Sequence, residues 1–173
     1  MIEPSYIHPN ASDILNETQN ILCASAKGKA LWDANKAKII ILKGPMPQAF
    51  VYQDDLIYLR IPALQNKGRA EQAIDLAGAF IELKINVQKP PPTENLESDE
   101  ILVEQHYKNV EIMMKAFEVA DELENSGYSA VKELRLMGVG KIYQAWKTGA
   151  DLEKCANIYW DMFDTSNSDN NKK

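Results

Sequence analysis

Residues 67–87 read KGRAEQAIDLAGAFIELKINV, and this run carries the clearest helical pattern in the chain. Its apolar side chains recur every three or four positions, the spacing of one face of an α-helix. The members of this face are Ala73, Ile74, Ala77, Phe80 and Ile81, and Lys84 continues it. A polar stripe lies on the other side of the same helix and consists of Glu71, Asp75, Gly78, Glu82 and Asn86. We therefore expect a helix with one apolar face and one polar stripe.

Three apolar runs of a different kind precede this helix. Residues 38–43, KIIILK, form a β-branched run that a Gly-Pro pair ends. Residues 48–53 and 56–61 are rich in aromatic and β-branched side chains and flank a two-residue acidic turn, a pattern that favours a β-hairpin. Together the three runs predict a small three-stranded sheet.

Helical spacing covers most of the remaining chain. The helices expected there span residues 12–35, 98–125, 128–136, 141–147 and 151–163. The predicted buried face of the longest one carries Val103, Tyr107, Val110, Met114, Phe117 and Ala120. The sequence therefore predicts a mostly helical α+β fold, with the small sheet packed against the 67–87 helix and a helical subdomain at the C-terminal end.

We expect one domain, residues 1–164, followed by a disordered polar tail over residues 165–173. A proline-rich linker separates a strand and hairpin core, residues 37–88, from a helical C-terminal part, residues 98–164. Neither part has a complete apolar core alone, so the linker is expected to join two parts of one domain.

Composition narrows the class of protein. The chain has 173 residues, 45% hydrophobic and 25% charged, with a net charge of −6. A net negative charge without a basic run argues against a nucleic-acid partner. The chain shows neither a secretory signal nor an apolar run of the roughly 18 residues that a membrane span needs. We expect a cytoplasmic protein without a membrane partner, with Cys23 and Cys155 as free thiols.

No intact motif for chemistry is present in the sequence. The two histidines, His8 and His106, belong to no His-x-Glu or His-x-x-x-His pair, so no metal site, catalytic residue or cofactor is predicted. Residues 138–141, GVGK, contain part of a phosphate-loop pattern but lack its first glycine and its Ser or Thr. They are expected to form a turn between helices.

The order of elements around the 67–87 helix is similar to that of zincin-like metallopeptidases. Small bacterial and phage members have a strand, a linker and then a helix of the type Leu-Ala-His-Glu-x-x-His. Here Leu76-Ala77 occupies the place of the Leu-Ala pair. On that alignment Gly78 and Glu82 replace the two zinc-binding histidines, and Ala79 replaces the glutamate that acts as general base.

The resemblance implies an inactive relative, a pseudoenzyme, that retains a substrate groove. Peptidase clefts bind an extended chain at the edge of a sheet, which needs no metal. The predicted groove residues are Tyr52, Tyr58, Arg60, Gly78 and Glu82. The function that follows is a catalytically inactive zincin-like domain acting as a protein-interaction or inhibitory module with a protein partner.

Two other functions fit the sequence. One is an unrelated helical adaptor, whose interface would be the aromatic side chains crowded near the C-terminus: Trp146, Tyr159, Trp160 and Phe163. The other is a cryptic hydrolase, whose polar residues would come from distant parts of the chain and leave no sequence motif.

Overall fold

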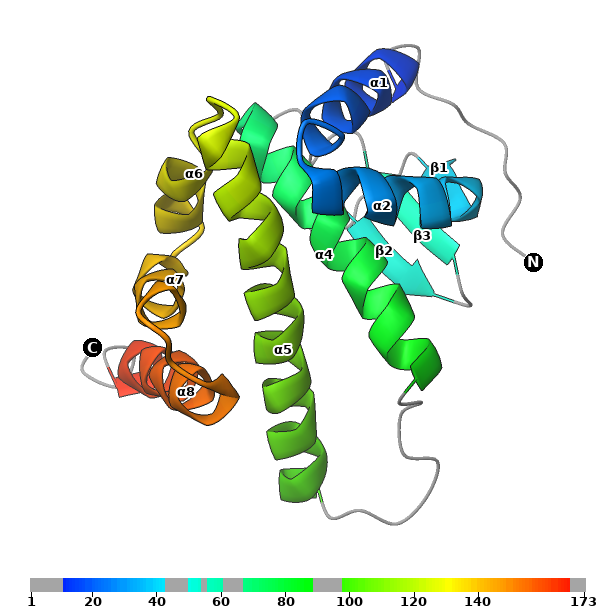
Figure 1. The fold of residues 1–173 in the computed structure, drawn as a ribbon. Helices are drawn as coiled ribbons and strands as arrows, with labels where there is room; N and C mark the ends of the chain where they lie inside the picture. Colours follow the sequence, from blue (N-terminus) through cyan, green and yellow to red (C-terminus); the bar gives the residue numbers. More distant parts are fainter. Residues whose placement is uncertain (1–10, 43–49, 54–55, 61–66, 89–97, 169–173) are drawn as a thin grey trace.

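The computed structural model describes residues 11–42, 50–53, 56–60, 67–88 and 98–168. Helices form most of this part of the chain (Figure 1). They are α1 (Ala11–Leu22), α2 (Ala26–Asn35), the 3-10 helix η1 (Lys36–Lys38), α4 (Arg69–Gln88), α5 (Ser98–Asn125), α6 (Ala130–Leu136), α7 (Gly140–Lys147) and α8 (Leu152–Ser168). The strands are β1 (Ile39–Leu42), β2 (Phe50–Gln53) and β3 (Leu56–Arg60).

Helix α4 lies at the centre of the fold. It contacts α1, α2, α5, α6 and the strands β2 and β3. Most of its residues from Ala70 to Ile85 are buried, and those that are not fall mainly on the polar stripe. The stripe residues Glu71, Asp75, Gly78, Glu82 and Asn86 are all half-buried. A helix that is apolar on nearly every side belongs in the core, and α4 has that pattern.

The three strands form a small sheet in the order β1-β3-β2. β2 and β3 are antiparallel, with Val51 opposite Tyr58, whereas β1 runs parallel to β3, with Ile39 opposite Ile57. Among the strand side chains that the structure describes, Ile57 is the one that is fully buried. Figure 1 shows the strands and α5 on different sides of α4.

The α+β class expected from the sequence is wrong, and the fold is helical. The strands are four, four and five residues long, whereas α4 and α5 have 20 and 28 residues. The large buried side chains come mainly from helices: Leu22, Leu76, Phe80, Leu83, Phe117, Leu123, Leu134 and Ile142. The core is therefore a packing of helices around α4, with the short strands along one side.

The helix expected over residues 12–35 is two helices, α1 and α2, with a break at Ser25. Ser25 has an extended backbone, and its hydroxyl oxygen accepts a hydrogen bond from the Gly28 N–H at 3.0 Å. This is an N-cap, which starts a new helix. The same hydroxyl donates to Glu122 Oε2 of α5 at 2.7 Å, so the break also fixes α2 against α5.

The C-terminal helices follow α5 as a series separated by tight turns. Gly127, Gly138 and Gly149 end α5, α6 and α7 with positive φ angles of 91°, 81° and 92°, a backbone conformation that glycine adopts without strain. The turn in 138–141 agrees with the helix-to-helix interpretation of GVGK. α8 continues to Ser168, so part of the predicted tail, residues 165–168, is helical, and residues 169–173 lie outside the described part.

Candidate functional site

A groove of about 460 Å³ lies between α4, α5 and α6, and we call it the α4–α5 groove. Its walls are mostly apolar, because α5 and the α6 region supply Ile112, Met113, Ala116, Phe117, Leu134, Met137 and Val139. Its polar lining residues are Lys67, Asp75, Glu82 and Asn109. Apolar walls with a few fixed polar groups are the usual composition of a binding site.

The floor of the α4–α5 groove is the polar stripe of α4. Asp75, Gly78 and Glu82 follow one another at helical spacing and all line it. A Cβ atom placed on Gly78 would have no atom within 4 Å beyond its own helix, so the floor is open at this residue. A glycine in the interior of a 20-residue helix therefore leaves space above the backbone where any other residue would project into the groove.

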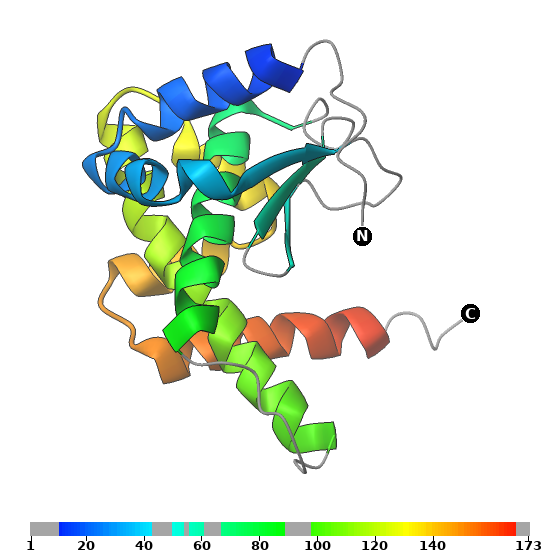
Figure 2. The same cartoon turned by 90° about the vertical axis from the view of Figure 1, so that its right-hand side faces the viewer.

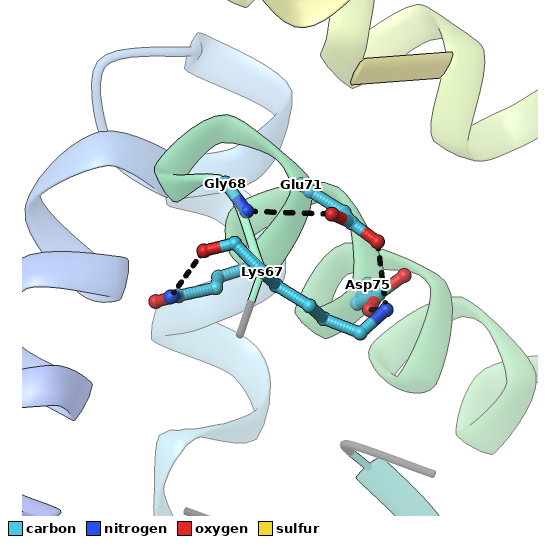
Figure 3. Close-up of polar contacts among 5 residues, drawn as sticks. Lys67, Gly68, Glu71 and Asp75 are labelled. Carbon is cyan, nitrogen blue, oxygen red and sulfur yellow. Dashed lines mark hydrogen bonds and ion pairs between the residues drawn. The ribbon is translucent and has the colours of Figure 1, made fainter. Parts of the chain in front are cut away.

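At the N-terminal end of α4 three charged side chains form a compact cluster (Figure 3). Lys67 Nζ donates to Glu71 Oε1 at 2.9 Å and to Asp75 Oδ2 at 2.6 Å. Burial raises the pKa of Asp75 even though the charge of Lys67 acts against it. Burial also acts to lower the pKa of Lys67, but its bonds to the two carboxylates prevail and raise it. This end of the groove is therefore occupied by an internal ion pair.

Glu82 is the other acidic group on the floor, two turns after Asp75. Burial raises its pKa, and the charge of Lys108 opposes that effect only in part. Within the described part of the chain Glu82 makes no hydrogen bond or ion pair. Its neighbours on the facing wall are apolar, apart from the amide of Asn109. Glu82 thus places a carboxylate that has no hydrogen bond among the described residues in a mostly apolar setting, where its charge is poorly solvated and only Lys108 opposes the effect of burial.

The groove does not fit a zinc ion. Gly78 and Ala79 have no side-chain atom that can bind a metal, and the two carboxylates that line the groove, Asp75 and Glu82, do not supply the three or four ligands of a zinc site. The α5 side chains that line the groove are Asn109, Ile112, Met113, Ala116 and Phe117, so the facing helix adds no carboxylate or histidine there. In the part of the chain that the structure describes, no three His, Cys, Asp or Glu side chains gather as metal ligands.

The predicted groove residues are only partly brought together. Gly78 and Glu82 line the same groove, whereas Tyr52 lies on β2, and Tyr58 and Arg60 lie on β3. β3 is paired on both sides, so it offers no free edge to an extended peptide, whereas β2, which holds Tyr52, is an edge strand of the described sheet. The side chains of the three strand residues lie outside the described part. The described walls of the groove come mainly from helices and not from the sheet, and the sequence did not indicate which elements would face α4.

Lys67, Asp75 and Asn109 were not among the predicted site residues. Lys67, Glu71 and Asp75 have a spacing of four residues, which on one helix face brings Lys and acidic side chains together. That spacing was a usable signal for the cluster. Nothing comparable pointed to Asn109, because its place opposite α4 depends on how α5 packs.

The four predicted interface aromatics do not form one exposed patch. Trp146 packs in the core beside Phe117 and Tyr143, with ring centroids 5.8 and 5.7 Å away. Tyr159 and Trp160 both contact the ring of His106, at 4.6 and 4.5 Å. Trp160 is 42% exposed, and the side chain of Phe163 lies outside the described part.

His106 lies on α5 and contacts α8. Its Nε2 is 3.2 Å from the Ala156 carbonyl oxygen, and two aromatic rings cover it. A ring with a backbone partner and aromatic contacts is a structural residue in this setting. His8 lies outside the described residues.

The two cysteines are free thiols, Cys155 buried and Cys23 half-buried. Burial raises the pKa of both, so neither resembles an activated nucleophile.

Among the described residues no helix combines the length and apolar character of a membrane span. Comparison of the chain with models of protein families, with curated proteins and with solved structures returned no match.

Proposed function

We propose that the protein is a non-catalytic binding module, an inactive relative of zincin-like peptidases, and that its α4–α5 groove holds a segment of a partner protein. The observation that carries the proposal is the groove over the polar stripe of α4, where Gly78 leaves the floor open and Glu82 is half-buried. These are the positions where the resembling family has its metal-binding histidines. Loss of those ligands, and of the base at Ala79, is why we propose binding and not hydrolysis.

The shape and lining of the groove support a segment with apolar side chains. Its volume of about 460 Å³ falls within the range of roughly 300–1,000 Å³ that is usual for ligand sites. The walls carry methionine and other aliphatic side chains, including Met113 and Met137. Methionine adapts its shape to an incoming apolar group, because its chain is unbranched and its sulfur is polarisable.

Glu82 supports a cationic group in the bound segment. Its carboxylate is half-buried and makes no hydrogen bond or ion pair within the described chain, and burial raises its pKa against the opposing charge of Lys108. A Lys or Arg side chain brought into the groove would neutralise this charge in a setting of low dielectric, where an ion pair with good geometry is strong. Asp75 is not available in the same way, because Lys67 already binds it. We therefore propose a partner segment with apolar residues around one Lys or Arg.

We place the protein in the cytoplasm as part of the same proposal. The two thiols are free and buried or half-buried, which suits a reducing compartment.

The experiment is a selection of displayed random peptides on the purified chain. We expect enrichment of peptides with one basic residue among apolar ones. These should lose affinity for Gly78→Leu, which fills the groove floor, and for Glu82→Gln, which removes the carboxylate charge. Glu153→Gln is the matched control, because Glu153 is an exposed carboxylate on α8 outside the groove.

Two outcomes would contradict the proposal. Peptides that bind Gly78→Leu and Glu82→Gln as tightly as the natural chain would move the binding site elsewhere. Peptide cleavage on addition of zinc, detected by mass spectrometry and lost in Glu82→Gln, would show that the protein is an enzyme.

A further inference from the structure

Every residue from 99 to 105 at the start of α5 is exposed, although Val103 borders a hollow that Trp160 of α8 also lines, and we call residues 99–105 the α5 tip. Both views show this end of α5 extending beyond α4 (Figures 1 and 2). Ile101, Leu102 and Val103 are 46%, 60% and 46% exposed. The sequence had placed Val103 and Tyr107 on a buried face, but in the structure Tyr107 is also exposed.

Such a tip needs a covering surface. Its large apolar side chains are exposed to water, and burying them against another surface is favourable. Three adjacent large apolar side chains on the surface mark an interaction site more often than a single one does. The tip is also acidic, because it contains Asp99, Glu100 and Glu104. Its complement should therefore be an apolar recess with a basic rim.

The same chain has a recess of that kind on another side of α4, between α2, α4 and α5. This second groove, the α2–α4–α5 groove, has a volume of about 570 Å³. Its apolar lining includes Ala30, Leu31, Ala34, Ile81, Ile85 and Val119. The small side chains of Ala30 and Ala34 leave room over α2 for the larger side chains of an incoming helix.

Four lysines line the α2–α4–α5 groove: Lys27, Lys38, Lys84 and Lys115. Lys27 pairs with Glu118 at 2.5 Å, and Lys115 pairs with Glu111 at 2.9 Å. Lys38 and Lys84 make no ion pair within the described part of the chain. The rim therefore has surplus positive charge, although the whole chain has a net charge of −6.

The tip cannot reach the groove of its own chain. Both include residues of α5, and a continuous helix holds Leu102 and Glu118 about 24 Å apart at 1.5 Å per residue. We propose that the α5 tip of one copy of this chain docks in the α2–α4–α5 groove of a second copy. Leu102 and its apolar neighbours enter the recess, and the tip carboxylates lie beside Lys38 and Lys84. The proposal is independent of the α4–α5 groove and its function.

Each copy has both a tip and a groove, so the contact joins two different surfaces of the chain. Two copies that exchange their tips form a closed, isologous pair with two identical contacts, whereas a contact made in one direction only is heterologous and extends into a ring or a chain. In either case the association depends on opposite charges at a partly exposed site, so it weakens as salt is added.

The test is sedimentation velocity on the full chain with two charge-reversed variants. The tip variant is Glu100→Lys with Glu104→Lys, and the groove variant is Lys38→Glu with Lys84→Glu. We expect the natural chain to associate, and each variant alone to associate at least about tenfold more weakly, because like charges then face each other. An equimolar mixture of the two variants should associate again, since each tip then meets a groove of opposite charge.

Circular dichroism establishes that both variants keep the helical fold. Recovered association in the mixture is a second sign that both variants are folded. A natural chain that stays monomeric at all concentrations overturns the proposal and leaves the groove to a different partner. An oligomer that neither variant weakens, or a mixture that does not recover, also overturns it, because the contact would then lie on another surface.

Discussion

Gly78→Ala tests whether the floor of the α4–α5 groove is open. Gly78 lies inside the 20-residue helix α4, and a Cβ at this position meets no atom within 4 Å outside its own helix. The substitution therefore adds a methyl group to empty space. Its main effect is on the backbone, because glycine loses more conformational freedom than alanine when a helix forms.

The magnitude follows from helix propensity. Glycine in a helix interior is about 1 kcal/mol less favourable than alanine, so Gly78→Ala should stabilise the fold by about that amount. For a chain of this size the gain corresponds to an increase of roughly 2–4 °C in melting temperature. With an m-value of about 1–3 kcal/mol/M, the urea midpoint should rise by about 0.3–1 M.

The assay is urea unfolding followed by circular dichroism, with Gly28→Ala as the matched control. Gly28 is also helical, in α2, but a Cβ there would lie 2.2 Å from the Leu22 carbonyl oxygen and 2.7 Å from its Cδ1. That contact forces the backbone to shift, and overpacking of this kind costs about 1–3 kcal/mol. Gly28→Ala should therefore destabilise the protein. Destabilisation by Gly78→Ala as well would refute the reasoning, because it would mean that the groove floor is packed.

Three further results are expected. Burial raises the pKa of Glu82 above 4.5, so ionisation of this carboxylate destabilises the fold as pH rises. Glu82→Gln should therefore have a higher urea midpoint than the natural chain at pH 7, and the difference between the two midpoints should shrink towards pH 4. An equal difference at the two pH values would contradict this. Ser25→Ala removes the hydroxyl that caps α2 and that donates to Glu122, so it should lower the free energy of unfolding by about 1–2 kcal/mol. An unchanged free energy of unfolding would show that the cap is dispensable. Burial and the hydrogen bond to Asp121 raise the pKa of Tyr143 to about 12. Titration followed by absorbance should therefore show one tyrosine that ionises near pH 12, and Tyr143→Phe should remove that step. Ionisation of all tyrosines by pH 11 would contradict this.

The strongest helical patterns predicted their elements well. The expected 98–125 helix is α5 with the same bounds, and the expected 67–87 helix is α4, Arg69–Gln88. In both helices the apolar side chains recur at helical spacing over many turns, and packing against other helices stabilises the same conformation. The break at Ser25 was missed because helical spacing continues across it, while the N-cap hydrogen bond and the contact with Glu122 depend on the folded chain.

The predicted fold class was wrong because an apolar run in the sequence does not show how many buried side chains its helix or strand contributes to the core. The β-branched run at 39–42 is conspicuous in the sequence, yet β1 has only four residues. By contrast, α4 is surrounded by other helices. The exposure of Val103 was missed for a related reason. Its spacing on α5 matches the buried face, but α4 does not extend far enough to cover it (Figure 2).

The floor of the candidate site could be predicted, but its walls could not. Gly78 and Glu82 share a stripe by helical periodicity alone, so the sequence was enough to place them together. Which element faces that stripe depends on the packing of α5 and α6, and these supply Met113 and Met137. The strand residues Tyr58 and Arg60 were chosen by analogy with a sheet-edge groove, whereas the strand that holds them is paired on both sides.

Calorimetric titration of one selected peptide into the natural chain and into Gly78→Leu tests the central claim, that the α4–α5 groove is a binding site. We expect the leucine side chain, which projects into the groove, to weaken binding at least about tenfold, or about 1.4 kcal/mol. Circular dichroism must show that Gly78→Leu keeps its fold. Equal affinity for the two folded proteins would contradict the claim.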